Sequence, residues 1–139
     1  MKNAIRCISI ALIEHHSKLL VFKAYEPFKN EYYHRPLGGG IEYRETAINA
    51  LRREFKEELN VSLYNIQLIT VIENLFEYRK KPKHEIVFLY KADVIEESFY
   101  TNEHLKINDD DSIELVWIPK KDFKSGKQII YPTEILDYL

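Results

Sequence analysis

Three acidic residues close together in the sequence, Glu54, Glu57 and Glu58, have the side chains and the spacing to hold a divalent cation. On a helix that turns about 100° per residue they share one arc of about 100°, beside the apolar stripe that contains Phe55. Like charges at these spacings repel one another, and a bound cation would remove the repulsion. Mg²⁺ prefers oxygen ligands and bridges carboxylates to phosphate oxygens, so this cluster indicates phosphoryl or pyrophosphoryl chemistry.

The short acidic motif by itself is also typical of a solvated helix face, so its distance from the glycine run matters. That run, at positions 38–40, holds three of the four glycines in the chain. Gly39 lies six residues before Glu45, and Arg53 follows Glu45 by eight. With this spacing, residues 39–61 resemble the Nudix box, G-x5-E-x7-R-E-U-x-E-E-x-G-U, in which U is a bulky aliphatic residue.

Two positions depart from the box. Phe55 stands where the family usually has an aliphatic residue, and because this position faces the core we expect only a change in packing. Asn60 replaces the last glycine, and asparagine tolerates the left-handed conformation that often ends a helix. The resemblance therefore implies an α/β protein with the Nudix fold, an α/β/α sandwich with a mixed β-sheet, formed by residues 1–139 as a single domain.

The resemblance also assigns roles within the box. It implies that Mg²⁺, or Mn²⁺, is bound by Glu54, Glu57 and Glu58 together with the backbone carbonyl of Gly39. Glu45 and Arg53 would form a supporting ion pair that orients these carboxylates. The implied catalytic residues are thus Glu45, Arg53, Glu54, Glu57 and Glu58.

The implied reaction is hydrolysis of a diphosphate (pyrophosphate) linkage in a nucleoside diphosphate derivative. Nucleoside triphosphates, ADP-ribose, dinucleoside polyphosphates, nucleotide sugars and capped RNA all stay open as substrates. A regulatory module with the same fold that binds a nucleotide without cleaving it is the alternative, although such a module would be expected to lose box carboxylates. An isomerase of isoprenoid diphosphates shares this architecture but would need further catalytic residues outside the box. The lone Cys7 lies in a predicted strand, so the sequence offers no obvious catalytic thiol for that reaction.

Several residues outside the metal cluster are candidates for the general base and for substrate binding. Arg35, Tyr33 and Arg79 are the candidate substrate-binding residues. The basic segment 79–83 could contact phosphate, and the aromatic residues Phe28, Tyr32 and Tyr33 could stack on a base, although both groups also fit a solvated turn and ordinary packing. The candidates for the general base are Glu54, Glu58, Glu97, Glu103, Asp109, Asp110 and Asp111.

The elements expected to position these residues follow from hydrophobic periodicity. Residues 45–59 contain no Gly or Pro and place apolar side chains at helical spacing, which predicts an amphipathic helix. Runs rich in β-branched residues predict strands at 5–13 and 19–24, and the aperiodic segment 25–35 predicts an irregular loop. In the second half of the chain we expect a hairpin from 66–78 and 84–94, a loop at 95–112, a strand at 113–118, a helical turn at 119–123 and a terminal helix at 132–139.

Composition limits the class of protein and its partners. The chain of 139 residues is 45% hydrophobic with a net charge of −2, which is typical of one globular core without a basic field for DNA. No stretch has the 18 to 20 or so apolar residues that a membrane span needs. The single cysteine excludes an internal disulfide and favours a cytoplasmic location. The resemblance implies a nucleotide-type small molecule as partner. From the composition we expect no membrane or DNA partner, and an aromatic-rich surface that permits a homodimer.

Overall fold

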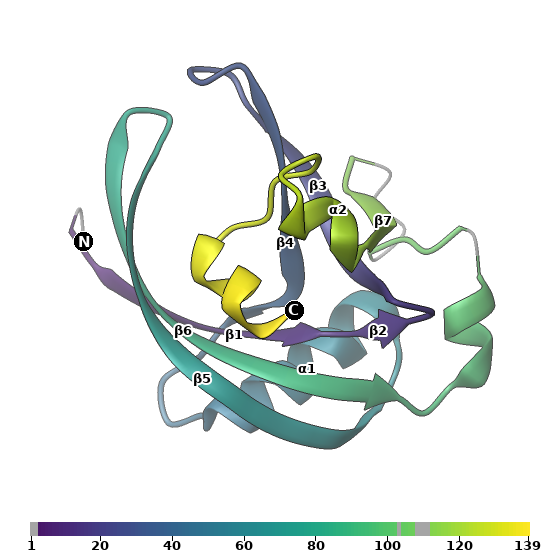
Figure 1. Ribbon diagram of the computed structural model, residues 1–139. Coiled ribbons are helices and arrows are strands. Elements are labelled where there is room, and N and C mark those ends of the chain that lie inside the picture. The colour runs from purple at the N-terminus through teal and green to yellow at the C-terminus, as the bar shows by residue number, and fades with distance from the viewer. Residues whose placement is uncertain (1–2, 103, 108–111) are drawn as a thin grey trace.

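The computed structural model describes residues 3–102, 104–107 and 112–139 as one curled sheet with helices on both sides (Figure 1). Two of the helices, η1 (Glu97–Thr101) and η2 (Thr133–Tyr138), are short 3₁₀ helices. The elements in chain order are β1 (Ile5–Leu12), β2 (Glu14–His15), β3 (Lys18–Glu26), β4 (Glu31–Gly40), α1 (Ala47–Leu59), β5 (Leu63–Tyr78), β6 (Lys81–Val94), η1 (Glu97–Thr101), β7 (Glu114–Pro119), α2 (Lys120–Lys124) and η2 (Thr133–Tyr138).

Strand β4 joins the two halves of the sheet. The strand order is β2-β3-β4-β1-β6-β5, with β7 paired to the other edge of β3. The first part of β4, residues 31–36, pairs with β3, and its last part, residues 37–40, pairs with β1. The β1–β6 pair is parallel and the other pairs are antiparallel, so the predicted mixed sheet is confirmed.

The sheet has a hydrophobic core on each face, as the alternation of side chains along β1 requires. Ile8, Ile10 and Leu12 pack with Phe123 of α2 and Ile135 of η2. The intervening residue Ala11 belongs to the other core, which contains Leu51 and Phe55 of α1. Figure 1 shows α1 on one side of the curled sheet and η2 on the other. The predicted layered α/β architecture is therefore confirmed.

Helix α1 ends where the sequence predicts and begins at Ala47, two residues later than predicted. The hydroxyl of Thr46 accepts a hydrogen bond from the backbone N–H of Asn49 at 3.2 Å and caps the helix N-terminus. Asn60 ends the helix with φ 54° and ψ 42°, the left-handed conformation expected of it. The buried hydroxyl of Ser9 in β1 donates to the carbonyl of Ala47 at 2.8 Å. This bond fixes the first turn of α1 against the sheet.

The predicted irregular loop at 25–35 is wrong. β3 continues to Glu26 and β4 starts at Glu31, so only a tight turn at 27–30 separates two paired strands. Asn30 in this turn has φ 51°, a conformation that asparagine adopts readily. Burial along β4 does not alternate regularly between inward and outward residues. The charged and aromatic side chains of this strand therefore do not give the alternating pattern by which a strand is predicted. The helix expected at 132–139 is the 3₁₀ helix η2.

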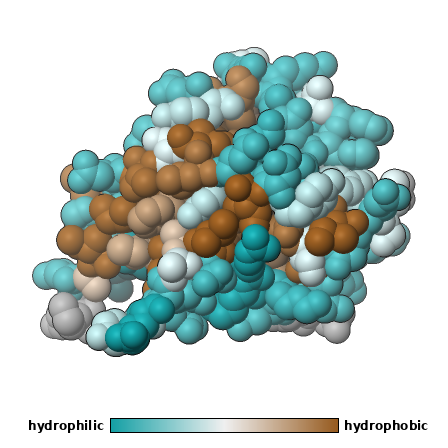
Figure 2. All heavy atoms as spheres, turned by 90° about the horizontal axis from the view of Figure 1, so that it is seen from below, coloured by the Kyte–Doolittle hydropathy of each residue, from teal (hydrophilic) through white to brown (hydrophobic). Residues whose placement is uncertain are grey.

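An apolar patch lies on the sheet beyond the reach of α1. Ile5 on β1 and Leu75 on β5 are 58% and 72% exposed, and both are in register with His84 of β6. Figure 2 shows apolar side chains gathered on the face seen from below. The homodimer expected from the sequence stays a prediction. Within the described ranges no helix has the length and apolar character to cross a membrane.

Candidate functional site

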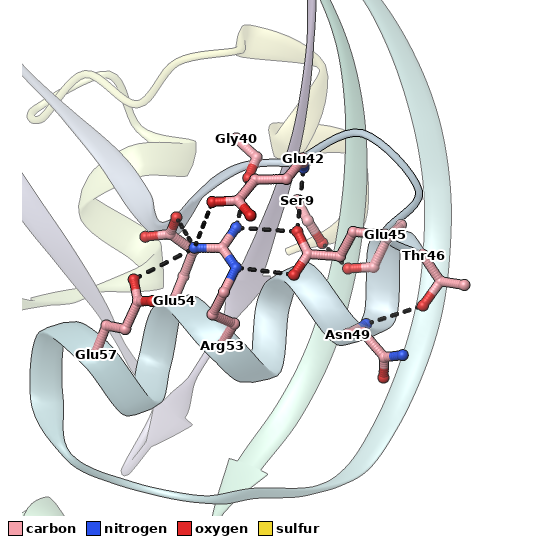
Figure 3. Close-up of polar contacts among 10 residues, drawn as sticks. Ser9, Gly40, Glu42, Glu45, Thr46, Asn49, Arg53, Glu54 and Glu57 are labelled. Atoms are coloured by element: carbon pink, nitrogen blue, oxygen red, sulfur yellow. Dashed lines mark hydrogen bonds and ion pairs between the residues drawn. The ribbon is translucent and has the colours of Figure 1, made fainter.

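Arg53 of α1 lies at the centre of the polar network that faces the end of β4 (Figure 3). Its Nε donates to Glu45 Oε2 at 2.8 Å and its Nη2 donates to Glu45 Oε1 at 3.0 Å, a bidentate pair. The hydrogen bonds that Arg53 donates to Glu45 raise the pKa of Arg53, and the same bonds lower the pKa of the Glu45 carboxyl. Both groups are therefore charged, and the loop before α1 is tied to the middle of the helix.

The same guanidinium also contacts the acidic residues predicted to bind metal. Arg53 Nη1 donates to Glu54 Oε1 at 2.9 Å and to Glu57 Oε2 at 3.3 Å. Its Nη2 donates to the carbonyl of Gly40 at 2.9 Å. One side chain thus fixes Glu54 and Glu57 relative to the C-terminal end of β4.

Gly39 allows the Glu54 carboxylate to lie directly against the backbone of β4. A Cβ atom at this position would lie 2.4 Å from Glu54 Cδ and within 2.7 Å of both carboxylate oxygens. No side chain can be accommodated at that distance unless Glu54 moves. The glycine in the motif is therefore explained by the close approach of a carboxylate.

Glu58 is the carboxyl of this cluster with the most strongly shifted pKa. Burial, a hydrogen bond with Glu54 and the negative charges of Glu54 and Glu57 raise the pKa of Glu58 to about 7. Glu58 is therefore partly protonated at neutral pH, and the proton lies in its hydrogen bond with Glu54. A cation bound there would displace that proton, since its charge favours the ionised carboxylate.

The donor atoms in this cluster fit a hard divalent cation. All four predicted ligands supply oxygen: Gly39, Glu54, Glu57 and Glu58. The structure brings three of them together, because Glu54 lies against Gly39 and shares a hydrogen bond with Glu58. Glu57 is linked to Glu54 only through Arg53. In the part of the chain that the structure describes, no three acidic, histidine or cysteine side chains already converge on one point.

An open cleft of about 810 Å³ lies beside the cluster, and Gly39 and Glu58 form part of its wall. Cationic and aromatic side chains from β1, β3, β4 and the β5–β6 hairpin form much of the remainder. These are Arg6, Lys23, Arg35, Arg79, Phe22, Tyr25, Tyr32 and Tyr78. The cleft therefore has the Glu58 carboxylate of the cluster in its wall, together with cationic and aromatic side chains. This combination suits an anionic ligand that carries an aromatic ring.

The three predicted substrate-binding residues have different positions. Arg35 lines the cleft, where its Nη2 pairs with the buried carboxylate of Glu85 at 2.9 Å. Arg79 also lines the cleft, at the tip of the β5–β6 hairpin. Tyr33 is not among the lining residues, and its ring packs against that of Tyr131 with centroids 5.5 Å apart. The substrate roles of these residues stay predictions.

The candidates for the general base also separate in space. Glu54 and Glu58 lie in the cluster described above. Glu97 lies on η1, outside the residues that line the cleft. The other candidates, Glu103, Asp109, Asp110 and Asp111, lie outside the described residues.

Sequence reasoning missed Glu26, which holds the two hairpins together. Its buried carboxylate accepts backbone N–H bonds from Lys29 at 2.7 Å and from Arg79 at 2.6 Å. Burial alone would raise the pKa of Glu26, but these donors and the N–H of Phe28 together lower it. A single acid before a Pro-containing turn gives no signal in one sequence, because its second partner is 53 residues away.

Comparisons with known proteins agree with this arrangement. The sequence profile of the NUDIX domain matches residues 4–137. A search of curated protein sequences gives no match.

Solved structures with the same fold extend over almost the whole chain. A NUDIX hydrolase from Nitrosomonas europaea has a TM-score of 0.67 and 17% identity, covering 96% of this chain and 85% of that one. A MutT NUDIX hydrolase from Burkholderia pseudomallei has a TM-score of 0.66 and 20% identity, covering 96% of both chains. A NUDIX family hydrolase from Clostridium perfringens has a TM-score of 0.59 and 21% identity, covering 95% of this chain and 96% of that one. At these identities the structures show the shared fold, and the profile match from residue 4 to residue 137 shows that the chain belongs to the NUDIX domain family.

Proposed function

We propose that this protein hydrolyses a diphosphate linkage in a nucleoside diphosphate derivative with the aid of Mg²⁺ or Mn²⁺. The observation that carries the proposal is the Arg53 network, in which one guanidinium holds Glu45, Glu54 and Glu57 in fixed relation to the end of β4. Such fixed carboxylates beside a cleft, with Glu58 of the same helix in its wall, are what a metal-assisted phosphoryl reaction requires.

Each residue of the cluster has a distinct part in this proposal. Glu54, Glu57, Glu58 and the carbonyl of Gly39 would hold the cation. When bound, the cation neutralises charge on the diphosphate and favours attack by water at phosphorus. Arg53 and Glu45 are positioning residues, because their bidentate pair orients the carboxylates without contacting the substrate. Glu54 and Glu58 are the candidates for the general base inside the cluster.

The rest of the cleft supports a nucleotide-type substrate. Tyr25 and Tyr32 line it with ring centroids 4.9 Å apart, a surface on which a base could stack. Arg35 and Arg79 supply positive charge along the same wall. We propose that residues 1–139 act as one domain in the cytoplasm, a setting with which the free and exposed Cys7 is compatible.

The test is a mass-spectrometric product assay of the purified protein with Mg²⁺ and, separately, with EDTA. The panel contains nucleoside triphosphates, ADP-ribose, dinucleoside polyphosphates, nucleotide sugars and capped RNA. We expect metal-dependent cleavage of at least one class, with a nucleoside monophosphate among the products. The masses of the fragments in ¹⁸O-labelled water identify the phosphorus that is attacked.

Matched variants connect any turnover to the cluster. Glu57→Gln and Glu58→Gln should abolish turnover with the fold intact, whereas Glu73→Gln, at an exposed position on β5, should leave it unchanged. Unchanged activity in both cluster variants would refute the assigned site. Binding of panel members in a thermal-shift assay without any cleavage would instead favour the nucleotide-binding regulatory module.

A further inference from the structure

Arg6 on β1 lies in the cleft close to the metal-binding cluster, and the sequence motif gives it no role. Its guanidinium lies over the backbone of Gly40: a Cβ atom on Gly40 would be 3.4 Å from Arg6 Nη2 and 3.6 Å from Nε. Gly39 and Gly40 therefore receive groups of opposite charge on the two faces of one strand, the Glu54 carboxylate at Gly39 and the Arg6 guanidinium at Gly40.

No carboxylate of the described residues forms an ion pair with Arg6. Among the described residues, no ion pair or hydrogen bond involves the Arg6 guanidinium, and the residue is exposed. Glu85, the partner of Arg6 across the β1–β6 ladder, is already paired with Arg35 at 2.9 Å. Two arginines thus share the surroundings of one buried carboxylate, which leaves net positive charge on this wall.

Other cations of the cleft are more fully engaged. Lys23 pairs with Glu114 at 3.9 Å and lies over the ring of Tyr32. Arg79 contacts the hydroxyl and the ring of Tyr78 at the far hairpin tip. Arg6 differs from both because its guanidinium occupies the space that a side chain at position 40, next to Gly39, would fill.

We infer that Arg6 binds two non-bridging oxygens of the second phosphate of the substrate, the phosphate beyond the one held at the carboxylate cluster. A guanidinium presents a planar set of donors that matches phosphate in a bidentate manner. Arg6 lines the same cleft as Gly39 and Glu58, so one ligand in the cleft can reach both the carboxylate cluster and Arg6. This inference rests on the proposed function and assigns a binding residue to the second phosphate of its diphosphate.

The test measures binding of two base-free probes in the presence of Mg²⁺, imidodiphosphate, which is not hydrolysed, and inorganic phosphate. By isothermal titration calorimetry we expect Arg6→Gln to weaken imidodiphosphate binding about tenfold or more, as loss of a charge-assisted contact does. Phosphate binding should change by less than about twofold. Arg6→Lys should give an intermediate loss, because it keeps the charge and loses the bidentate geometry.

The control variant is Lys91→Gln, which removes the same charge from an exposed position on β6 outside the cleft lining. It should bind both probes as the wild type does, and thermal melting should show all three variants folded. Imidodiphosphate affinity within twofold of wild type in Arg6→Gln would overturn the inference, as would an equal loss for phosphate.

The inference and the proposed function can fail separately. If the wild-type protein hydrolyses a panel substrate and Arg6→Gln raises its KM about tenfold with little change in kcat, both stand. Turnover with an unaltered KM in Arg6→Gln overturns the role of Arg6 alone. Arg6-dependent binding of imidodiphosphate by a protein that cleaves nothing supports the role of Arg6 and refutes the hydrolase.

Discussion

The two ends of the cleft are held in contrasting ways. At the cluster, Arg53 joins Glu45, Glu54 and Glu57, partners that lie no more than eight residues from it in the sequence. At the hairpin tips, Glu26 joins its own turn to Arg79, a partner 53 residues away. Local spacing can encode the first arrangement, whereas the second exists only after the sheet has curled. The comparison indicates that a short motif encodes the candidate carboxylate cluster, whereas long-range packing determines the shape of the cleft.

The largest expected effect comes from changing the centre of the local network. Arg53→Lys keeps the charge but cannot form the bidentate pair with Glu45 while also reaching Glu54 and the Gly40 carbonyl. We expect kcat on the identified substrate to fall about 100-fold, because misplaced catalytic groups lose most of their effect. Steady-state kinetics measures this, with Arg44→Lys in the exposed loop before α1 as control. An effect confined to KM would contradict a positioning role.

The second prediction concerns the contact between Gly39 and Glu54. Gly39→Ala would place a methyl group 2.4 Å from Glu54 Cδ and force that carboxylate to move. We expect about a tenfold or larger fall in kcat and a higher Mg²⁺ concentration for half-maximal rate. Gly126→Ala is the control, because nothing lies within 4 Å of its added Cβ and its effect is confined to backbone strain. Equal activity losses in the two variants would attribute the effect to general strain.

The third prediction tests the non-local end of the cleft. Glu26→Gln replaces a carboxylate acceptor of several backbone N–H bonds with an amide that accepts fewer. We expect a melting temperature lower by a few degrees and a severalfold higher KM, because Arg79 and Tyr78 line the cleft at this tip. Thermal melting and kinetics should be compared with Glu77→Gln, an exposed position on β5. A change in kcat with KM unaltered would show that Glu26 acts on the carboxylate cluster and would contradict its role in shaping the cleft.

The smallest effect is a pH dependence of the metal-free protein. The pKa of Glu58 is raised from 4.5 to about 7 in the folded state, so the folded protein binds more protons than the unfolded one between these values. The contribution of Glu58 to stability is therefore complete below about pH 4.5 and is lost as the pH rises through about 7. Urea unfolding in EDTA should show this slope, and Glu58→Gln should remove it. Saturating Mg²⁺ should also reduce the slope, and an identical slope with metal would contradict binding at Glu58.

The sequence by itself determined the local parts of this protein. The apolar repeat within residues 45–59 and the left-handed conformation of Asn60 define α1, and the spacing from Gly39 to Glu58 defines the carboxylate cluster. These features depend on side chains within a few helical turns, so periodicity and spacing carry the information. The same local reasoning was wrong at 25–35, where a strand pair replaces the expected loop.

Only the tertiary structure decided how the cleft is built around that cluster. Arg6, Glu26 and Glu85 have no sequence signal, because their positions depend on which strands become neighbours in the curled sheet. Tyr33 illustrates the same limit, since its ring packs on Tyr131 at the far end of the chain. Pairing of distant strands depends on the sum of many weak contacts, and no single residue pattern records it.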